Sequence, residues 1–573
     1  MTWQQIAAEK KSHQLDSVPK EWLSSTLPSA ETLSVIDFPP ESKVLSALDL
    51  EITESSVASL LSNLASSKWS AVQVTTSFYK RAIVAQQLTN CLTEIFVDRA
   101  LARAKALDEH LEKTGQVVGM LHGLPISLKD QISIQGIEST IGYVSWVGQF
   151  AEKNSVLVDI LESLGAVPFV KTNVPQTLMW PETFNNIFGR TTNPYNRSLT
   201  SGGSSGGEGA LVGDPLGVGS DIGGSVRIPA GFCGVYGFRP SSNRVPYAGC
   251  VNTLEGEDSV LSVLGPLSNT LDGIKIFFKA VLSKEPWLKD PMVMRKRWSD
   301  EEYKLIDHGN GEKLCFAIMW DDGIVVPHPP VRRGLEITKK ALLAAGHQVI
   351  DWKSYKQAEI SANVVSVDGM TSTNRVLIRA ILKSAIWNAA AAEDFMAAAA
   401  PTGEPVIASM GILQEDDELL FRPSGAAISA FELWQVHKKK RDLRQEYLKH
   451  WEDTISQTGT GRPVDAIIGP MASYTAPPHG LNKTAQYTMW CNLLDYPAMI
   501  IPVSKVDQAL DAKQMREEFY TAEDQENYEL YNPATYENAP ISIQVVGRTM
   551  EEEAVIAMSE IVDEALRASK SNI

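Results

Sequence analysis

The sequence predicts an α/β fold in which helices cover both faces of a β-sheet. Two units carry this prediction, at residues 125–170 and 314–351. Each unit consists of a short strand, a helix with apolar residues on one face, and a second strand. A strand–helix–strand order at this spacing is typical of a sheet with helices packed against it. The two units do not share a repeated sequence.

The elements of these units follow from local patterns. In the first strand, Ile126 and Leu128 point to one side, while Ser127 and Lys129 point to the other, so Lys129 lies at a strand end and faces away from the apolar side. The expected elements are a strand at 125–129, a helix that begins at Asn154 or Ser155 and ends before Gly165, a strand at 166–170, and then a strand at 314–318, a helix at 331–345 and a strand at 347–351.

The chain divides into an N-terminal arm, residues 1–55, and a main part, residues 56–573, which by length alone could hold two or more domains. The arm is polar and carries four prolines, which is typical of a segment lying on the surface. Apolar residues at three- and four-residue spacing predict three helices at the start of the main part. The expected elements are helices carrying Val57, Leu60 and Leu61, then Val74, Phe78, Ala82 and Ala85, then Leu101, Ala104 and Leu111 within 98–111; late strands at 464–469 and 541–546; an acidic surface excursion at 507–538; and a last helix with a Thr549/Glu552 capping box that packs Val555, Met558, Val562 and Ala565.

Composition limits the function classes. The chain has 573 residues, 44% of them hydrophobic and 21% charged, as in an ordinary globular protein. The formal net charge of −17 argues against a nucleic-acid or membrane partner. The five cysteines are scattered without metal or redox spacing, and the first residues include no apolar signal segment. We therefore expect a cytoplasmic protein with no metal and no cofactor.

Residues 201–230 form the most unusual stretch of the sequence. Two Gly-Gly-Ser corners place Ser204 and Ser225 where backbone N–H groups can crowd one point, as in an oxyanion site. A flexible linker and a phosphate-binding loop are the alternatives. Apolar residues interrupt the run, which disfavours a linker, and the Lys-Ser/Thr end of a phosphate loop is missing. The interrupting residues include Leu216, Val218, Ile222, Val226 and Ile228.

This stretch resembles the signature of the amidase signature family of serine hydrolases, and most closely its fungal acetamidase branch. The matching segments are 202–208 and 221–229, with further likeness at 121–131 and 539–547. The resemblance implies that residues 56–573 form one amidase domain, with a large mixed β-sheet, helices on both faces and a signature core at about 117–270. It also implies that a helical insertion at about 385–460, with Phe431, Trp434, Leu448 and Trp451 beside a basic face, shapes the substrate funnel; a plain packing helix is the alternative.

The same resemblance implies roles for individual residues. The catalytic triad would be Lys129 as base, Ser204 as a bridging serine after a cis peptide bond, and Ser225 as nucleophile. The remaining implied residues are Ile222, Gly223, Gly224 and Ser225, whose N–H groups form the oxyanion hole; Leu178, Met179, Trp180 and Gly203, which bind substrate; and Asp221 and Arg227, which hold the loop.

The chemistry requires Lys129 to be neutral when it accepts a proton. A lysine has an ordinary pKa near 10.4, so burial must lower it. His122 is an alternative base and Lys171 a rival lysine, each with a structural role as the simpler interpretation. If both Gly-Gly-Ser serines merely cap turns, no triad exists.

The predicted reaction is hydrolysis of a small aliphatic amide such as acetamide or acrylamide, or of an alkyl carbamate such as ethyl carbamate. Trp180 would shorten the acyl pocket, although a core position is equally consistent with its size. The alternatives are an amidotransferase-type subunit that supplies ammonia to a partner and a catalytically silent binding paralogue. A homo-oligomer is compatible with the sequence.

Overall fold

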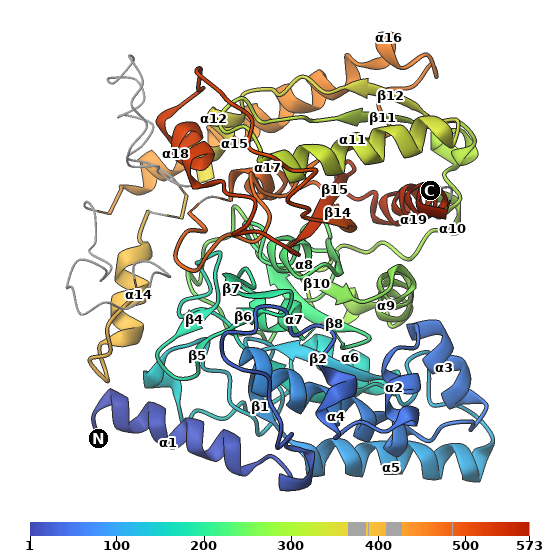
Figure 1. The fold of residues 1–573 in the computed structure, drawn as a ribbon, viewed down its shortest axis with the longest axis vertical. Helices are drawn as coiled ribbons and strands as arrows, with labels where there is room; N and C mark the ends of the chain where they lie inside the picture. The colour runs from blue at the N-terminus through green and yellow to red at the C-terminus, as the bar shows by residue number, and fades with distance from the viewer. Residues whose placement is uncertain (212, 365–385, 388, 408–426, 484, 572–573) are drawn as a thin grey trace.

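A mixed β-sheet runs through the molecule in the computed structural model (Figure 1). Across the described residues, 1–211, 213–364, 386–387, 389–407, 427–483 and 485–571, eleven strands form this sheet in the order β1-β3-β2-β8-β10-β9-β14-β15-β13-β11-β12. The strands of this sheet are β1 (Leu92–Ile95), β2 (Pro125–Lys129), β3 (Val167–Thr172), β8 (Gly217–Asp221), β9 (Tyr236–Arg239), β10 (Val263–Ser268), β11 (Cys315–Ile318), β12 (Gln348–Asp351), β13 (Ala466–Pro470), β14 (Ala498–Lys505) and β15 (Pro540–Val546). Two further two-stranded sheets pair β4 (Phe184–Asn185) with β5 (Gly189–Arg190) and β6 (Thr192–Asn193) with β7 (Asn196–Thr200).

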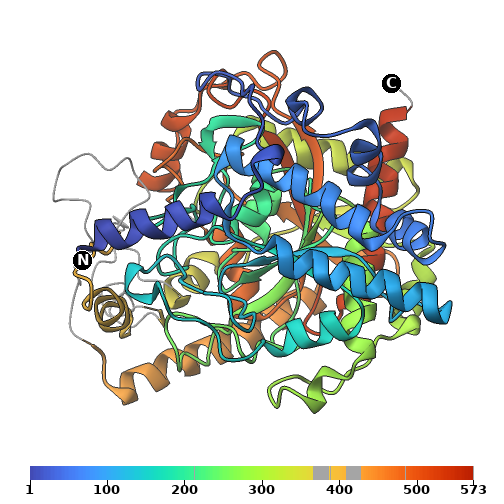
Figure 2. The same cartoon turned by 90° about the horizontal axis from the view of Figure 1, so that it is seen from below.

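Helices surround the sheet, and the N-terminal helices α1, α4 and α5 lie across the same side of the molecule (Figure 2). The helices are α1 (Trp3–Asp16), α2 (Ala47–Thr53), α3 (Val57–Ala65), α4 (Ala71–Thr89), α5 (Val97–Thr114), α6 (Val156–Ser163), α7 (Gly206–Ala210), α8 (Arg227–Phe232), α9 (Leu271–Ser283), α10 (Asp300–Tyr303), α11 (Pro329–Ala344), α12 (Gln357–Val364), α14 (Ala391–Ala399), α15 (Ala430–Glu452), α16 (Ile455–Thr458), α17 (Gln486–Leu494), α18 (Ala522–Leu530) and α19 (Glu552–Ser571).

Alternating residues of the central strands enter different apolar clusters, as expected for a sheet covered on both faces. On β14, Met499 and Ile501 belong to the largest cluster, whereas Ala498 and Ile500 belong to two others. The predicted α/β fold with a mixed sheet is therefore confirmed.

Both predicted strand–helix–strand units are present. β2 has the predicted bounds, Ser155 is the N-cap of α6, and β3 follows. β2 pairs in parallel with β3 on one side and with β8 on the other. In the second unit, β11 and β12 pair in parallel and α11 lies between them in the chain. The strands and helices expected elsewhere correspond to α3, α4, α5, β13, β15 and α19.

Four details differ from the expectations. The arm contains α1, whose Thr2/Gln5 capping box begins a helix without a pronounced apolar face. On α5 the buried residues are Ala100, Ala104 and Leu107, so the register inferred from Leu101 and Leu111 was wrong. The helix α19 begins at Glu552, whose carboxylate binds Arg244 instead of capping the helix. On α15, Phe431, Trp434 and Leu448 are exposed, while Trp451 is buried.

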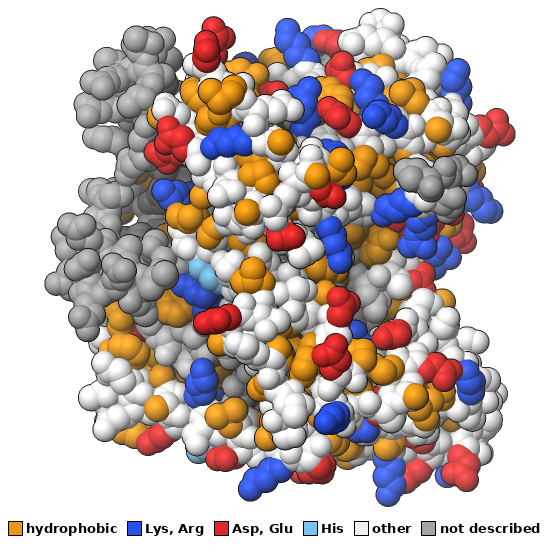
Figure 3. Space-filling model, viewed as in Figure 1, with side chains coloured by type: hydrophobic (Ala, Val, Ile, Leu, Met, Phe, Trp, Pro, Cys, Tyr) orange, Lys and Arg blue, Asp and Glu red, His pale blue; other side chains and the backbone are white. Residues whose placement is uncertain are grey.

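The expected insertion at 385–460 is described in part, because residues 385, 388 and 408–426 lie outside the described ranges. No helix within those ranges is long and apolar enough to cross a membrane. On the face shown in Figure 3, acidic and basic side chains are interspersed, so the net negative charge is not gathered into one field there.

Candidate functional site

The site lies where the parallel strands β2 and β8 end side by side. Ser127 and Leu128 of β2 pair with Gly217 and Val218 of β8. Lys129 lies at the end of β2, Ser220 and Asp221 lie at the end of β8, and all three are buried. This edge of a parallel sheet, beyond the carboxyl ends of its strands, is a common place for ligands to bind.

Lys129 makes two short contacts at this edge. Its Nζ lies 2.7 Å from Ser204 Oγ and 2.7 Å from Ser220 Oγ. Burial lowers the pKa of Lys129 to about 7, against the opposing effect of nearby carboxyl groups, of which Asp221 is the strongest. A sizeable fraction of the amine is therefore neutral at neutral pH, as a general base requires.

The two Gly-Gly-Ser corners meet through the backbone. The Ser205 N–H donates to the Ser225 carbonyl at 3.1 Å, and the Gly203–Ser204 peptide bond is cis, as the resemblance implied. Gly203 is closely packed, because a Cβ there would lie 2.6 Å from the Trp180 carbonyl oxygen. No hydrogen bond joins the Ser204 and Ser225 hydroxyls in the described part of the chain, so the structure joins Lys129 to Ser204 directly and brings Ser225 to the adjoining segment.

The loop that carries Ser225 presents free backbone donors. Among the residues that the structure describes, the N–H groups of Ile222, Gly223 and Ser225 donate no hydrogen bond. The fourth expected donor, the Gly224 N–H, is engaged with Asp221 Oδ1 at 2.9 Å. Ser225 itself is buried, with 9% of the residue exposed, and three free N–H groups on its loop can stabilise an oxyanion.

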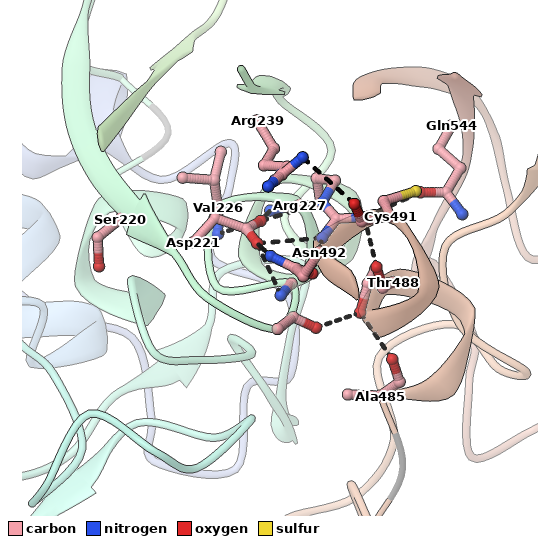
Figure 4. Close-up of polar contacts among 12 residues, drawn as sticks. Ser220, Asp221, Val226, Arg227, Arg239, Ala485, Thr488, Cys491, Asn492 and Gln544 are labelled. Atoms are coloured by element: carbon pink, nitrogen blue, oxygen red, sulfur yellow. Dashed lines mark hydrogen bonds and ion pairs between the residues drawn. The ribbon is translucent and has the colours of Figure 1, made fainter. Parts of the chain in front are cut away.

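A buried ion pair holds this loop (Figure 4). Arg227 Nε and Nη2 each donate to the Asp221 carboxylate at 3.0 Å. Burial alone would raise the pKa of Asp221, but the charge and hydrogen bonds of Arg227 hold this pKa well below its usual value. The same carboxylate accepts the N–H groups of Gly224 and Val226. The two residues therefore have the loop-holding contacts that the resemblance implied.

Helix α17 closes the loop from a distant part of the chain. Asn492 Nδ2 donates to Asp221 at 2.8 Å, and Asn492 Oδ1 accepts from Arg227 at 2.7 Å. Thr488 Oγ1 donates to the Gly223 carbonyl at 2.6 Å (Figure 4). The loop is thus fixed by hydrogen bonds at both ends.

An apolar wall stands next to the loop. Met179 and Ile222 pack in the cluster that contains Trp387 and Met489. The Trp387 ring lies directly over the loop, since a Cβ on Gly223 would lie 2.6 Å from Trp387 Cη2. The 385–460 insertion therefore reaches the site through Trp387.

The other residues expected to bind substrate lie in different surroundings. Leu178 packs in a separate cluster with Ile141, Tyr143 and Val174. Trp180 is half-buried, and its indole Nε1 is buried without a hydrogen-bond partner in the described part of the chain. Their substrate-binding role stays a prediction.

The rival bases have partners elsewhere. His122 Nδ1 accepts the Val118 N–H at 3.2 Å, and burial lowers its pKa. Lys171 Nζ donates to the Glu138 carbonyl at 2.7 Å and to Ser139 Oγ at 2.5 Å. Within the described ranges, no group of three or more His, Cys, Asp or Glu side chains is placed to hold a metal ion.

Sequence reasoning missed several residues of the site. Ser220 could have been found, because it lies in the 201–230 stretch and directly precedes the matching segment 221–229. Thr488, Asn492 and Trp387 carried no local signal, since only the fold brings them to the loop.

Comparisons with known proteins give the family of this chain. The family model Amidase matches residues 73–556. An acetamidase of Emericella nidulans is 41% identical over 99% of this chain and 98% of its own length, and an acetamidase of Aspergillus oryzae is 38% identical over 99% of both. A solved structure of fatty acid amide hydrolase matches with a TM-score of 0.85 and 28% identity, covering 98% of this chain and 94% of that one. This chain therefore belongs to the amidase family and is a hydrolytic amidase.

Proposed function

We propose that this amidase hydrolyses small aliphatic amides through an acyl-enzyme on Ser225, with Ser204 as proton relay and Lys129 as base. The observation that carries the proposal is the 2.7 Å contact between Lys129 Nζ and Ser204 Oγ at a fully buried position. Burial supplies the neutral amine that base catalysis needs.

In the proposed first step, Ser225 Oγ attacks the amide carbonyl carbon. Its proton passes to Ser204 Oγ while the Ser204 proton passes to the neutral Lys129 amine. The free N–H groups of Ile222, Gly223 and Ser225 then stabilise the oxyanion. Each such donor typically contributes about 10²–10³ in kcat.

The intermediate collapses when the leaving nitrogen receives a proton. The Lys129 ammonium returns its proton through Ser204, the C–N bond breaks, and ammonia departs. Water then attacks the acyl-enzyme with the same relay acting as base, which releases the acid and restores Ser225.

The apolar wall supports a short acyl group. Trp387, Met179 and Met489 stand beside the loop, and Trp180 adjoins Gly203. The 41% identity to an acetamidase, against 28% to fatty acid amide hydrolase, favours acetamide-sized substrates. Acetamide, propionamide, acrylamide and ethyl carbamate share a carbonyl with a small substituent. We also propose a cytoplasmic location, where the five free cysteines would stay reduced.

Labelling of the nucleophile tests the proposal. Incubation with a fluorophosphonate should add one mass increment to the peptide that contains Ser225, and Ser225→Ala should remove both the adduct and the turnover while the protein stays folded. Lys129→Ala should also be inactive. An intact, folded enzyme that gains no adduct, or normal turnover by either variant, would contradict the mechanism.

A substrate panel tests the specificity. The purified chain alone should release ammonia from acetamide and ethyl carbamate faster than from long-chain or aryl amides. Robust hydrolysis without a partner would exclude an ammonia-supplying subunit and a silent binding paralogue. A preference for long-chain amides would contradict the small-substrate proposal.

A further inference from the structure

Lys129 has a second hydroxyl neighbour that the proposed relay does not use. Ser220 Oγ lies as close to Nζ as Ser204 Oγ does, at 2.7 Å. Ser220 is 3% exposed and directly precedes the loop-holding Asp221 at the end of β8. One hydroxyl can donate to the amine while the other accepts from it. The lone pair of Lys129 points toward the hydroxyl that donates.

Gln131 decides the direction of the Ser220 hydrogen. Ser220 Oγ lies 2.5 Å from Gln131 Oε1, and the Gln131 amide nitrogen donates to Tyr247 Oη at 2.6 Å and to the Val251 carbonyl at 3.1 Å. A carbonyl oxygen only accepts, so the nitrogen of Gln131 must face Val251 and its oxygen must face Ser220. The single hydrogen of Ser220 therefore goes to Gln131, and Ser220 can only accept from Lys129.

We propose that Ser220 and Gln131 are positioning residues that turn the lone pair of Lys129 toward Ser204. A neutral amine has two N–H groups and one lone pair. Ser220 accepts a hydrogen bond from one N–H group, which limits rotation about the last carbon–nitrogen bond of the side chain. The lone pair then stays free to receive the Ser204 proton. This inference rests on the proposed function, in which Lys129 is the base.

The arrangement also acts on the protonation of Lys129. A hydroxyl acceptor stabilises an ammonium more than a neutral amine, because charge-assisted hydrogen bonds are the stronger ones. Removal of Ser220 should therefore lower the pKa of Lys129 while it impairs catalysis. The other titratable side chains that act on this amine are Asp221, Glu208, Asp130 and Cys250. The Ser220 substitution leaves all four unchanged.

Kinetics of the full-length enzyme test the inference. In Ser220→Ala, kcat for acetamide should fall about tenfold or more, with KM little changed, since an ill-directed base loses part of its roughly 10²–10⁴ contribution. The acid limb of the kcat/KM profile should move about one pH unit lower. Ser220→Thr keeps the hydroxyl and should restore kcat and the acid limb. In Gln131→Met, Ser220 is free to donate to the lysine lone pair, so kcat should fall although the hydroxyl remains.

Ser139→Ala is the matched control, because Ser139 makes the same kind of bond to the buried Lys171. It should leave kcat and the pH profile unchanged, and a fall like that of Ser220→Ala would point to a general packing effect and overturn the inference. Thermal unfolding confirms that each variant is folded. If Ser220→Ala does not fold, Gln131→Met carries the test.

Wild-type kcat and an unmoved acid limb in folded Ser220→Ala or Gln131→Met would overturn the inference. If Lys129→Ala and Ser225→Ala are inactive in the same assay, the proposed function stands and only the positioning role fails. Normal turnover by Lys129→Ala would instead remove the proposed function.

Discussion

Acidification from pH 8 to pH 5 should switch this amidase off through Lys129. Only the neutral amine can accept the proton, so kcat/KM should rise as the pH passes upward through the lysine pKa. With a pKa of about 7, half of the molecules carry the neutral amine at pH 7, and only about 1% do at pH 5. A lysine with an ordinary pKa near 10.4 would be neutral in only about 0.04% of molecules at pH 7.

The assay is ammonia release from acetamide between pH 5 and pH 9. We expect kcat/KM to fall about 50-fold from pH 7 to pH 5, and to level off above pH 8. Tryptophan fluorescence and recovery of the rate at pH 8 control for unfolding. His122→Asn should leave the profile unchanged, because the proposed base is Lys129; if His122 were the base, the substitution would remove the acid limb. A profile without an acid limb between pH 5 and pH 8, or one that disappears in His122→Asn, would refute the reasoning.

Three further substitutions test the loop and the wall. Gly224→Ala should lower kcat by about 10² or more, because φ is +132° and the new Cβ would lie 2.2 Å from Thr488 Oγ1; an active variant in steady-state assays would contradict this. Arg227→Met leaves Asp221 buried and unpaired, so urea titration should show a loss of about 3–5 kcal/mol in unfolding free energy, and an unchanged midpoint would argue against the ion pair. Trp387→Ala should raise kcat/KM for hexanamide relative to acetamide about tenfold, and an unchanged ratio would remove Trp387 from the acyl pocket.

Local sequence patterns predicted the elements whose boundaries are set locally. The alternation in β2 and the Ser155 cap of α6 depend on neighbouring residues alone, so these elements were predicted closely. Strand β14 was missed, because its run of apolar residues is buried on both faces and does not alternate with polar ones. Helix α1 was missed because it lacks a strong apolar face, although its Thr2/Gln5 pair was a usable signal.

The same distinction applies to the site. Ser204, Asp221 and Ser225 lie in one motif and were predicted together from the sequence. Which N–H groups stay free depends on the path of the loop: Gly224 turns its N–H to Asp221, and no pattern in the motif predicts this. Trp387 is more than 150 residues away from the motif in the chain, so only the folded structure brings it to the loop.

The low pKa of Lys129 also depends on how the surrounding carboxyl groups are neutralised. Asp221 is paired with Arg227. Burial raises the pKa of Glu208 to about 7 and that of Asp214 well above its usual value. Ser127 Oγ lies 2.5 Å from a carboxyl oxygen of both Glu208 and Asp214.

A hydroxyl has one hydrogen and cannot donate to both of these acceptors, so a protonated carboxyl group must supply the second hydrogen bond. At least one of Glu208 and Asp214 is therefore neutral when both contacts are made. A carboxyl group without its charge does not stabilise the ammonium form of Lys129. The amine can thus act as a base near neutral pH although acidic side chains surround it: burial outweighs their charges, Asp221 is paired with Arg227, and at least one of Glu208 and Asp214 is neutral.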